Sequence, residues 1–230
     1  MDKLAPIPAL PLVAILRGLE PERAAEVAHA LFDAGLRIVE VPLNRPGALQ
    51  AIATIVRMAP HDALVGGGTM LSAADVDAVH AAGGRLMVAP NCDAAVIARA
   101  RQLGMLAMPG VATPSEAFAA LAAGAHALKL FPAEVIGTAG LKAFASVLPA
   151  GTGLWPVGSV TPGSLAAWRA AGAAGAGIGS QLFTPALPLA QIGERARAFA
   201  LRRTAMRPRA TRGARARPGR PDPGAAGGAR

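Results

Sequence analysis

Lys129 is the residue of this chain whose surroundings most clearly permit covalent chemistry. It lies in the segment 125–134, AHALKLFPAE, between Leu128 and Leu130, in a run that otherwise has the character of a buried strand. Lysine is almost never fully buried without a partner, and burial disfavours its charged form. A neutral lysine amine attacks ketones to form a Schiff base, so Lys129 is a candidate nucleophile. The alternative is that Lys129 ends the strand and extends its ammonium group into water.

Two further charged residues lie near the ends of predicted strands. Arg17 follows the apolar run VAIL, and Glu40 lies within IVEV. In a β/α barrel, alternate strand residues point inward and active sites form at the C-terminal ends of the strands. The alternation therefore predicts that Arg17, Glu40 and Lys129 meet at one mouth of the barrel. A structural salt bridge would account for two of these charges, but three charges from separate strands favour a functional site.

Two glycine-containing loops near the end of the domain are candidates for holding a phosphate group. Val157, Gly158 and Ser159 follow the seventh predicted strand, and Gly179 and Ser180 follow the eighth. Loops at these two places, with helices that begin there, are where β/α barrels bind phosphate through backbone N–H groups. The alternative is that the glycines only form tight turns.

A third glycine-rich turn follows the third predicted strand. Residues 66–68 are all glycine, which lets a ligand approach the backbone closely, and Thr69 adds a hydroxyl group. Asn44, Pro90 and Asn91 follow the second and fourth strands and are expected to line the same mouth. Helix-capping and turn roles explain the two asparagines equally well.

The elements that would position these residues alternate regularly along the chain. Short apolar runs and alanine-rich helical segments follow one another from residue 10 to about residue 200. Eight such units in about 190 residues predict an α/β fold, a (β/α)₈ TIM barrel. An open doubly wound sheet would carry a glycine-rich fingerprint at its first crossover, whereas the first crossover here, ILRGLEPER, has one glycine. The expected strands are 10–16, 37–41, 63–66, 85–89, 106–108, 126–130, 154–157 and 174–178, and the expected helices are 21–34, 47–59, 72–82, 93–103, 114–123, 138–147, 162–171 and 188–203.

Composition excludes several classes of protein. Hydrophobic residues make up 53% of the chain, which suffices for a sizeable core, and the single cysteine, Cys92, excludes a disulfide framework or a multi-cysteine metal site. The histidines show no paired ligand spacing, so we expect no metal; they are His29, His61, His80 and His126. We find no apolar run of membrane-spanning length and no signal peptide, and expect a cytoplasmic protein without membrane association.

The end of the chain differs from the rest. Residues 202–230 contain nine arginines and one acid, so they carry +8 of the formal net charge of +9. We therefore expect one TIM-barrel domain over 1–201, followed by an Arg/Pro/Gly-rich disordered tail over 202–230. Such a tail could bind nucleic acid through salt-dependent contacts. It lacks aromatic residues for base stacking, so we do not expect a dedicated nucleic-acid partner.

Beyond these single features, the chain resembles the class I 2-keto-3-deoxy-6-phosphogluconate/galactonate aldolase family over about residues 10–185. This resemblance implies a Schiff base at Lys129, a glutamate acid/base at Glu40, a homotrimer, a phosphorylated keto-acid substrate and no cofactor. The motifs that carry it are ILRG at 15–18, VEVPLN at 39–44, GGGTML at 66–71, APN at 89–91, PGVATPSEA at 109–117, LKLFPAE at 128–134 and VGSVTP at 157–162.

Within that family, the chain is more similar to the 6-phosphogalactonate branch than to the 6-phosphogluconate branch. The galactonate branch has Val-Pro-Leu-Asn after the glutamate, as here, and this chain has Val157 where the gluconate branch usually has threonine. The second glycine of the usual phosphate loop is replaced by Ser159. Substrates of the gluconate configuration and 4-hydroxy-2-oxoglutarate remain alternatives.

The resemblance also implies how the substrate is held. Arg17, Thr69 and Pro90 are expected to bind the pyruvate carboxylate, since an arginine fork suits a carboxylate. The phosphate would be bound by Gly158, Ser159, Gly179 and Ser180.

Overall fold

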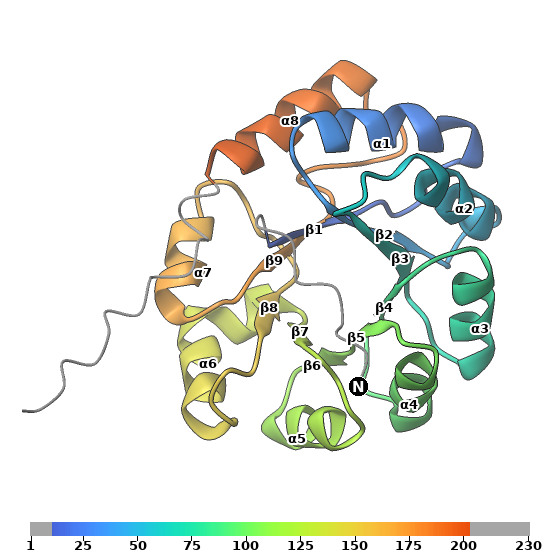
Figure 1. Ribbon diagram of the computed structural model, residues 1–230. Coiled ribbons are helices and arrows are strands. Elements are labelled where there is room, and N and C mark those ends of the chain that lie inside the picture. Colours follow the sequence, from blue (N-terminus) through green and yellow to red (C-terminus); the bar gives the residue numbers. More distant parts are fainter. Residues whose placement is uncertain (1–10, 203–230) are drawn as a thin grey trace, which may run out of the picture.

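Parallel strands and α-helices alternate throughout the computed structural model, which describes residues 11–202. The helices lie outside and the strands inside, as Figure 1 shows. The strands are β1 (Leu12–Ile15), β2 (Ile38–Pro42), β3 (Leu64–Gly68), β4 (Leu86–Val88), β5 (Leu106–Met108), β6 (Gly110–Val111), β7 (Leu128–Leu130), β8 (Leu154–Pro156) and β9 (Ala176–Ile178). The helices are η1 (Pro21–Arg23, a 3₁₀ turn), α1 (Ala24–Asp33), α2 (Ala48–Met58), α3 (Ala73–Ala81), α4 (Ala94–Gln102), α5 (Pro114–Ala122), α6 (Ala133–Val147), α7 (Leu165–Ala171) and α8 (Leu189–Leu201).

The strands form two parallel sheets that meet at both of their edges. One sheet has the order β5-β4-β3-β2-β1-β9, and the other has the order β6-β7-β8. The N–H of His126 donates to the carbonyl of Ala107 at 2.9 Å at one junction, and Val157 bridges to Gly177 at the other. The predicted α/β repeats are therefore confirmed, as a curved parallel arrangement in two hydrogen-bonded sheets.

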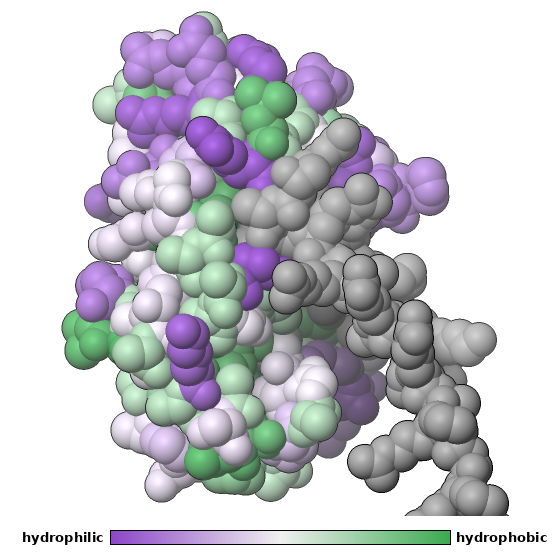
Figure 2. Space-filling model, turned by 90° about the vertical axis from the view of Figure 1, so that its left-hand side faces the viewer, coloured by the Kyte–Doolittle hydropathy of each residue, from purple (hydrophilic) through white to green (hydrophobic). Residues whose placement is uncertain are grey.

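Two groups of buried apolar side chains fill the interior. A small inner group lies between the strands and includes Val13, Ile15, Trp155 and Val157. A larger outer group packs the strands against the surrounding helices. On the face that carries α6 and α7, the surface mixes hydrophilic and apolar side chains (Figure 2). Strands buried on both faces explain why the sequence shows continuous apolar runs there.

Side-chain caps fix where several helices begin. Ser72 and Asp75 form a reciprocal capping box at the start of α3, and Thr113 and Glu116 form another at the start of α5. The Asp93 carboxylate accepts hydrogen bonds from two backbone N–H groups at the start of α4. Because each helix follows a strand directly, these caps also fix where the loops at the C-terminal mouth end.

The structure departs from the predicted elements in two places. A short strand, β6, follows Pro109, and α6 begins at Ala133, five residues earlier than expected, with a break at Gly137 (φ 68°, ψ 173°). The predicted tail, 202–230, lies almost wholly outside the described residues. Between residues 11 and 202, no helix has the length and apolar character needed to cross a membrane.

Candidate active site

Lys129 is buried at the centre of β7, with 5% of its surface exposed. Its backbone pairs in register with Gly110 of β6 and Trp155 of β8, so the position of the side chain is fixed by strands on both sides. The amine Nζ lies 5.1 Å from the centroid of the Phe131 ring. A lysine held in this way presents its amine at a fixed place in the interior, as a nucleophile that forms a Schiff base requires.

Glu40 of β2 is the other buried charged residue of the described chain, with 2% exposure. Its Oε2 atom is buried without a hydrogen-bond partner. Burial raises the pKa of the Glu40 carboxyl above its ordinary value of 4.5, and the charges of Lys129 and Arg17 oppose that rise. A carboxyl whose pKa is raised in this way holds a proton more readily than an exposed one, which suits an acid/base group.

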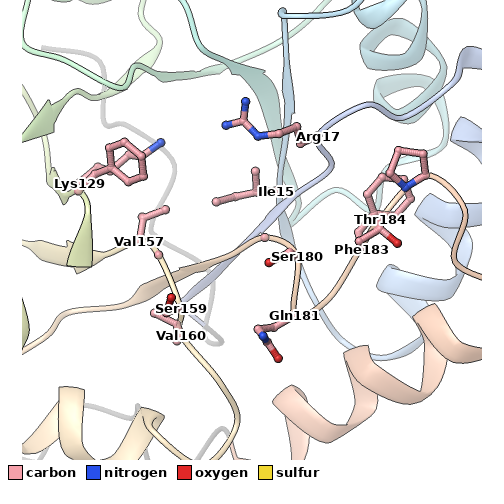
Figure 3. A pocket seen from close by; sticks show the side chains of 14 residues that line it. Ile15, Arg17, Lys129, Val157, Ser159, Val160, Ser180, Gln181, Phe183 and Thr184 are labelled. Carbon is pink, nitrogen blue, oxygen red and sulfur yellow. The ribbon is translucent and has the colours of Figure 1, made fainter. Parts of the chain in front are cut away.

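A pocket of about 330 Å³ opens beside Lys129 at the C-terminal ends of the strands. In the view of Figure 3, Lys129 and Arg17 enter from opposite sides and their charged ends point toward one another. The pocket is lined by Ile15, Arg17, Lys129, Phe131, Val157, Gly158, Ser159, Val160, Gly179, Ser180, Gln181, Phe183, Thr184 and Pro185. It therefore joins positive charge, a buried amine and two loops in one cavity.

The two loops predicted to hold phosphate both line this pocket. Gly158 has φ 118° and Ser159 has φ 52°, so a serine adopts the left-handed backbone region there. Such a conformation costs a non-glycine residue free energy, and it is more common at ligand sites than elsewhere. Next to this loop, the N–H of Thr161 donates to Ser164 Oγ at 3.0 Å, which fixes the approach to α7. A hypothetical Cβ on Gly179 would meet no atom within 4 Å, so its backbone is open to a ligand.

Seven of the ten sequence-predicted site residues line the pocket: Arg17, Lys129, Val157, Gly158, Ser159, Gly179 and Ser180. Glu40, Thr69 and Pro90 do not line it. Thr69 follows β3 with φ 53°, and Pro90 lies beside Gly110, where an added Cβ would overlap the Pro90 carbonyl. Of these three residues, only Glu40 is linked electrostatically to Lys129 and Arg17.

Several pocket residues were not predicted from the sequence. Phe131, Gln181, Phe183 and Thr184 line the cavity from loops that follow β7 and β9. Arg23 supports the second loop, since its guanidinium donates to the carbonyls of Pro185 and Leu187. Only Phe131, within the lysine motif, carried a usable signal. Beyond Gly179 and Ser180, the rest of the loop after β9 could be placed only by its tertiary contacts.

The histidines lie apart from this pocket. His126 Nδ1 accepts a hydrogen bond from the N–H of Ala107 at 2.9 Å, and Arg101 contacts Nε2. Burial and the charge of Arg101 lower the pKa of His126. Within residues 11–202, no three His, Cys, Asp or Glu side chains cluster as a metal site would require.

The comparisons with known proteins agree with this arrangement. A sequence profile of the family described as KDPG and KHG aldolase matches residues 5–193. The chain is 46% identical to a probable 2-dehydro-3-deoxy-6-phosphogalactonate aldolase of Rhizobium meliloti (strain 1021), over 85% of this chain and 93% of that protein. It is also 46% identical to the 2-dehydro-3-deoxy-6-phosphogalactonate aldolase of Escherichia coli (strain K12), over 83% and 93%.

A solved structure gives the same result for the fold. The structure described as native KDPGal superimposes with a TM-score of 0.83 and 45% identity, over 85% of this chain and 96% of that one. The resemblance seen in the sequence motifs is thereby confirmed, and the chain belongs to the KDPG and KHG aldolase family.

Proposed function

We propose that this protein is a class I aldolase that cleaves 2-dehydro-3-deoxy-6-phosphogalactonate to pyruvate and D-glyceraldehyde 3-phosphate. The observation that carries the proposal is the buried Lys129 amine, which faces Arg17 across a pocket and lies within electrostatic reach of the buried Glu40. A desolvated amine, an acid/base group and an anion-binding group are the parts that Schiff-base cleavage of a keto acid requires.

Lys129 begins the reaction. Its Nζ attacks the C2 ketone, and loss of water from the resulting carbinolamine gives a protonated imine. The imine accepts the electron pair of the C3–C4 bond, so an enamine of pyruvate forms as that bond breaks. In other enzymes a Lewis-acidic metal withdraws electrons from the carbonyl in this way. Here the imine does so, and the scheme uses no metal or other cofactor.

Glu40 carries the proton. Its carboxylate, through a water molecule, removes the proton of the C4 hydroxyl, and C4 leaves as the aldehyde carbon of D-glyceraldehyde 3-phosphate. The same carboxyl then returns the proton to C3 of the enamine. Water hydrolyses the imine, which releases pyruvate and restores the Lys129 amine.

The remaining predicted site residues orient the substrate, although Thr69 and Pro90 lie outside the lining of the pocket. Arg17, with Thr69 and the turn at Pro90, binds the pyruvate carboxylate, and the guanidinium fork suits two carboxylate oxygens. At the other end, the phosphate is bound by Gly158, Ser159, Gly179 and Ser180. The left-handed backbone at Ser159 supports this role, because it turns the loop over the cavity.

The choice of substrate rests on the names of the relatives and on Val157. Both relatives at 46% identity are described as 6-phosphogalactonate aldolases. Val157 is buried and lines the pocket, so it presents methyl groups where a threonine would present a hydroxyl. The gluconate-configured substrate and 4-hydroxy-2-oxoglutarate are the second candidates, since the family description includes both activities.

We also propose the wider setting of the enzyme. The hydrogen bonds at both sheet junctions support a closed (β/α)₈ barrel over the domain ending at residue 201. A homotrimer and a cytoplasmic location complete the proposal, with the family as its support. The Arg-rich tail from 202 to 230 is proposed to take no part in catalysis.

Borohydride trapping tests the central claim. Reduction in the presence of pyruvate should add a pyruvate-derived mass to the peptide that contains Lys129, and Lys129→Arg should abolish both the adduct and turnover, because a guanidinium cannot form the imine. Lys142→Arg on α6 is the matched control and should retain both. An adduct on Lys142 or Lys3 in place of Lys129 would overturn the assignment.

A further inference from the structure

The last three residues of β3, Gly66, Gly67 and Gly68, are glycines although none has a left-handed backbone. Glycine is therefore not required there by the φ angle. Each position must be explained by the space that a side chain would occupy.

What an added Cβ would meet differs at each of the three positions. At Gly66 it would overlap the backbone carbonyl of Leu86 in β4. At Gly67 it would lie 2.7 Å from Val79 Cγ2, on the helix-facing side. At Gly68 it would overlap Oε2 of Glu40 and lie 2.7 Å from Cδ of the same carboxyl. Only Gly68 thus leaves its space to a side chain of the proposed active site.

The strand register explains how Glu40 reaches that space. Glu40 pairs with Gly66, and Pro42 pairs with Gly68, so the Glu40 side chain runs two residues along β3 toward the C-terminal mouth. Its carboxyl group ends over the Cα of Gly68, where Oε2 is buried without a hydrogen-bond partner. Because no hydrogen bond holds Oε2, the shape of its surroundings determines where the oxygen sits.

We propose that Gly68 is a positioning residue for proton transfer, because the Glu40 carboxyl occupies the space that a side chain at position 68 would fill. The inference rests on the proposed acid/base role of Glu40. Displacement of a reacting group by about 1 Å can cost 10²-fold in rate, and a methyl group at position 68 demands a displacement of that order.

Gly68→Ala separates proton transfer from imine formation. Wild-type enzyme in D₂O should exchange the methyl protons of pyruvate through the enamine, and NMR follows this exchange. In Gly68→Ala the exchange rate should fall about 10²-fold, while borohydride still traps pyruvate on Lys129. Gly67→Ala is the control, because it adds the same methyl group to the same strand but meets Val79 and Met70 instead of Glu40. In this variant the exchange rate and the amount of trapped pyruvate should both change only in proportion to the folded fraction of the protein.

A stability cycle tests the contact itself, without using activity. Glu40→Asp shortens the side chain by one methylene and withdraws the carboxyl from Gly68. Gly68→Ala should therefore lower the urea midpoint of wild type by more than it lowers that of Glu40→Asp. If Gly68→Ala alone does not fold, recovery of soluble protein in the Gly68→Ala/Glu40→Asp double variant supports the contact, and its failure overturns the inference.

The two experiments keep the proposals distinguishable. If wild type neither traps nor exchanges pyruvate, the proposed function fails, and the stability cycle still reports on the contact. If wild type does both and Gly68→Ala exchanges at the wild-type rate, the function stands and the role of Gly68 is wrong. Equal urea shifts in the two backgrounds would contradict the contact as well.

Discussion

Glu40 makes the pH dependence of folding a residue-scale test of the site. The pKa of this carboxyl is raised above 4.5 in the folded protein, first by burial. The folded chain therefore holds a proton that the unfolded chain has released, and the free energy of unfolding falls as the pH rises from about 4.5 through the folded pKa. Glu40→Gln removes this titration. Its stability relative to wild type should rise across that window and level off above it, in urea unfolding from pH 4 to pH 8. A difference that is constant with pH would contradict the burial effect.

Turnover gives a second test of the same side chain. Glu40→Gln keeps the shape of the group and removes its ability to carry a proton, so kcat should fall by roughly 10²–10⁴-fold. Borohydride trapping of pyruvate on Lys129 should persist in part, because the amine is unchanged. Asp33→Asn, at an exposed carboxyl at the end of α1, is the comparison for the loss of one negative charge. Wild-type turnover in Glu40→Gln would remove Glu40 from the mechanism.

Val157 tests the choice between the two C4 epimers. A buried valine tolerates a hydroxyl but cannot bond it, and apolar pockets discriminate weakly. We expect kcat/KM for the galactonate epimer to exceed that for the gluconate epimer by about 10-fold, and Val157→Thr to shift the ratio toward the gluconate epimer. Both epimers should be measured on both proteins, with Val147→Thr on the exposed side of α6 as control. If wild type already prefers the gluconate epimer, the substrate assignment is wrong while the reaction class survives.

The sequence located the charged and glycine-rich positions of the site because each lies at a strand end. It could not place Gln181 or Thr184, because the loop after β9 carries no motif beyond Ser180 and is held by Arg23 of η1. Nor could it distinguish Gly68 from Gly66 and Gly67. That distinction requires the register between β2 and β3, which brings the Glu40 carboxyl over one glycine and not the others.

At the scale of elements, the capping box of α5 should contribute stability without touching catalysis. Thr113 Oγ1 accepts from the N–H of Glu116, and Glu116 Oε2 accepts from the N–H groups of Ala112 and Thr113 at 2.8 Å each. Thr113→Ala should lower the free energy of unfolding by about 1 kcal/mol. Ser115→Ala, two residues later and exposed, should change it by less than about 0.5 kcal/mol. Urea unfolding measures both, and kcat per folded molecule should not change in either variant.

Each predicted strand and helix segment overlaps an observed element, because apolar runs and capping residues mark the units clearly. The misses have local causes. Pro109 interrupts the apolar run, so the sequence does not predict β6 after it. Gly137 interrupts the helical pattern, so the sequence does not predict the turn of α6 that begins at Ala133. The division into two separate sheets depends on hydrogen bonds between distant strands, which no local pattern reports.

At the scale of the whole molecule, the charge and the chemistry should be separable. A chain truncated after Leu201 loses nearly all of the formal net charge of +9, and its aldolase activity should equal that of the full chain. Any salt-dependent binding of the full chain to nucleic acid should disappear with the tail. Filter binding at two salt concentrations, beside a coupled assay for pyruvate, measures both. Loss of activity on truncation would assign the tail a part in the enzyme.

The position of β1 between β2 and β9 has a consequence for biosynthesis. Val13 pairs with Ile38 on one side and with Gly177 on the other, so the first described strand pairs with the second and with the last. At translation rates of about 5–20 residues per second, β9 is synthesised roughly 10–30 s after β1, and one edge of β1 lacks that partner until then. An unpaired strand edge is a template for pairing with other nascent chains. The yield of soluble protein should therefore depend on how fast the ribosome travels between these two strands, as well as on the stability of the finished fold.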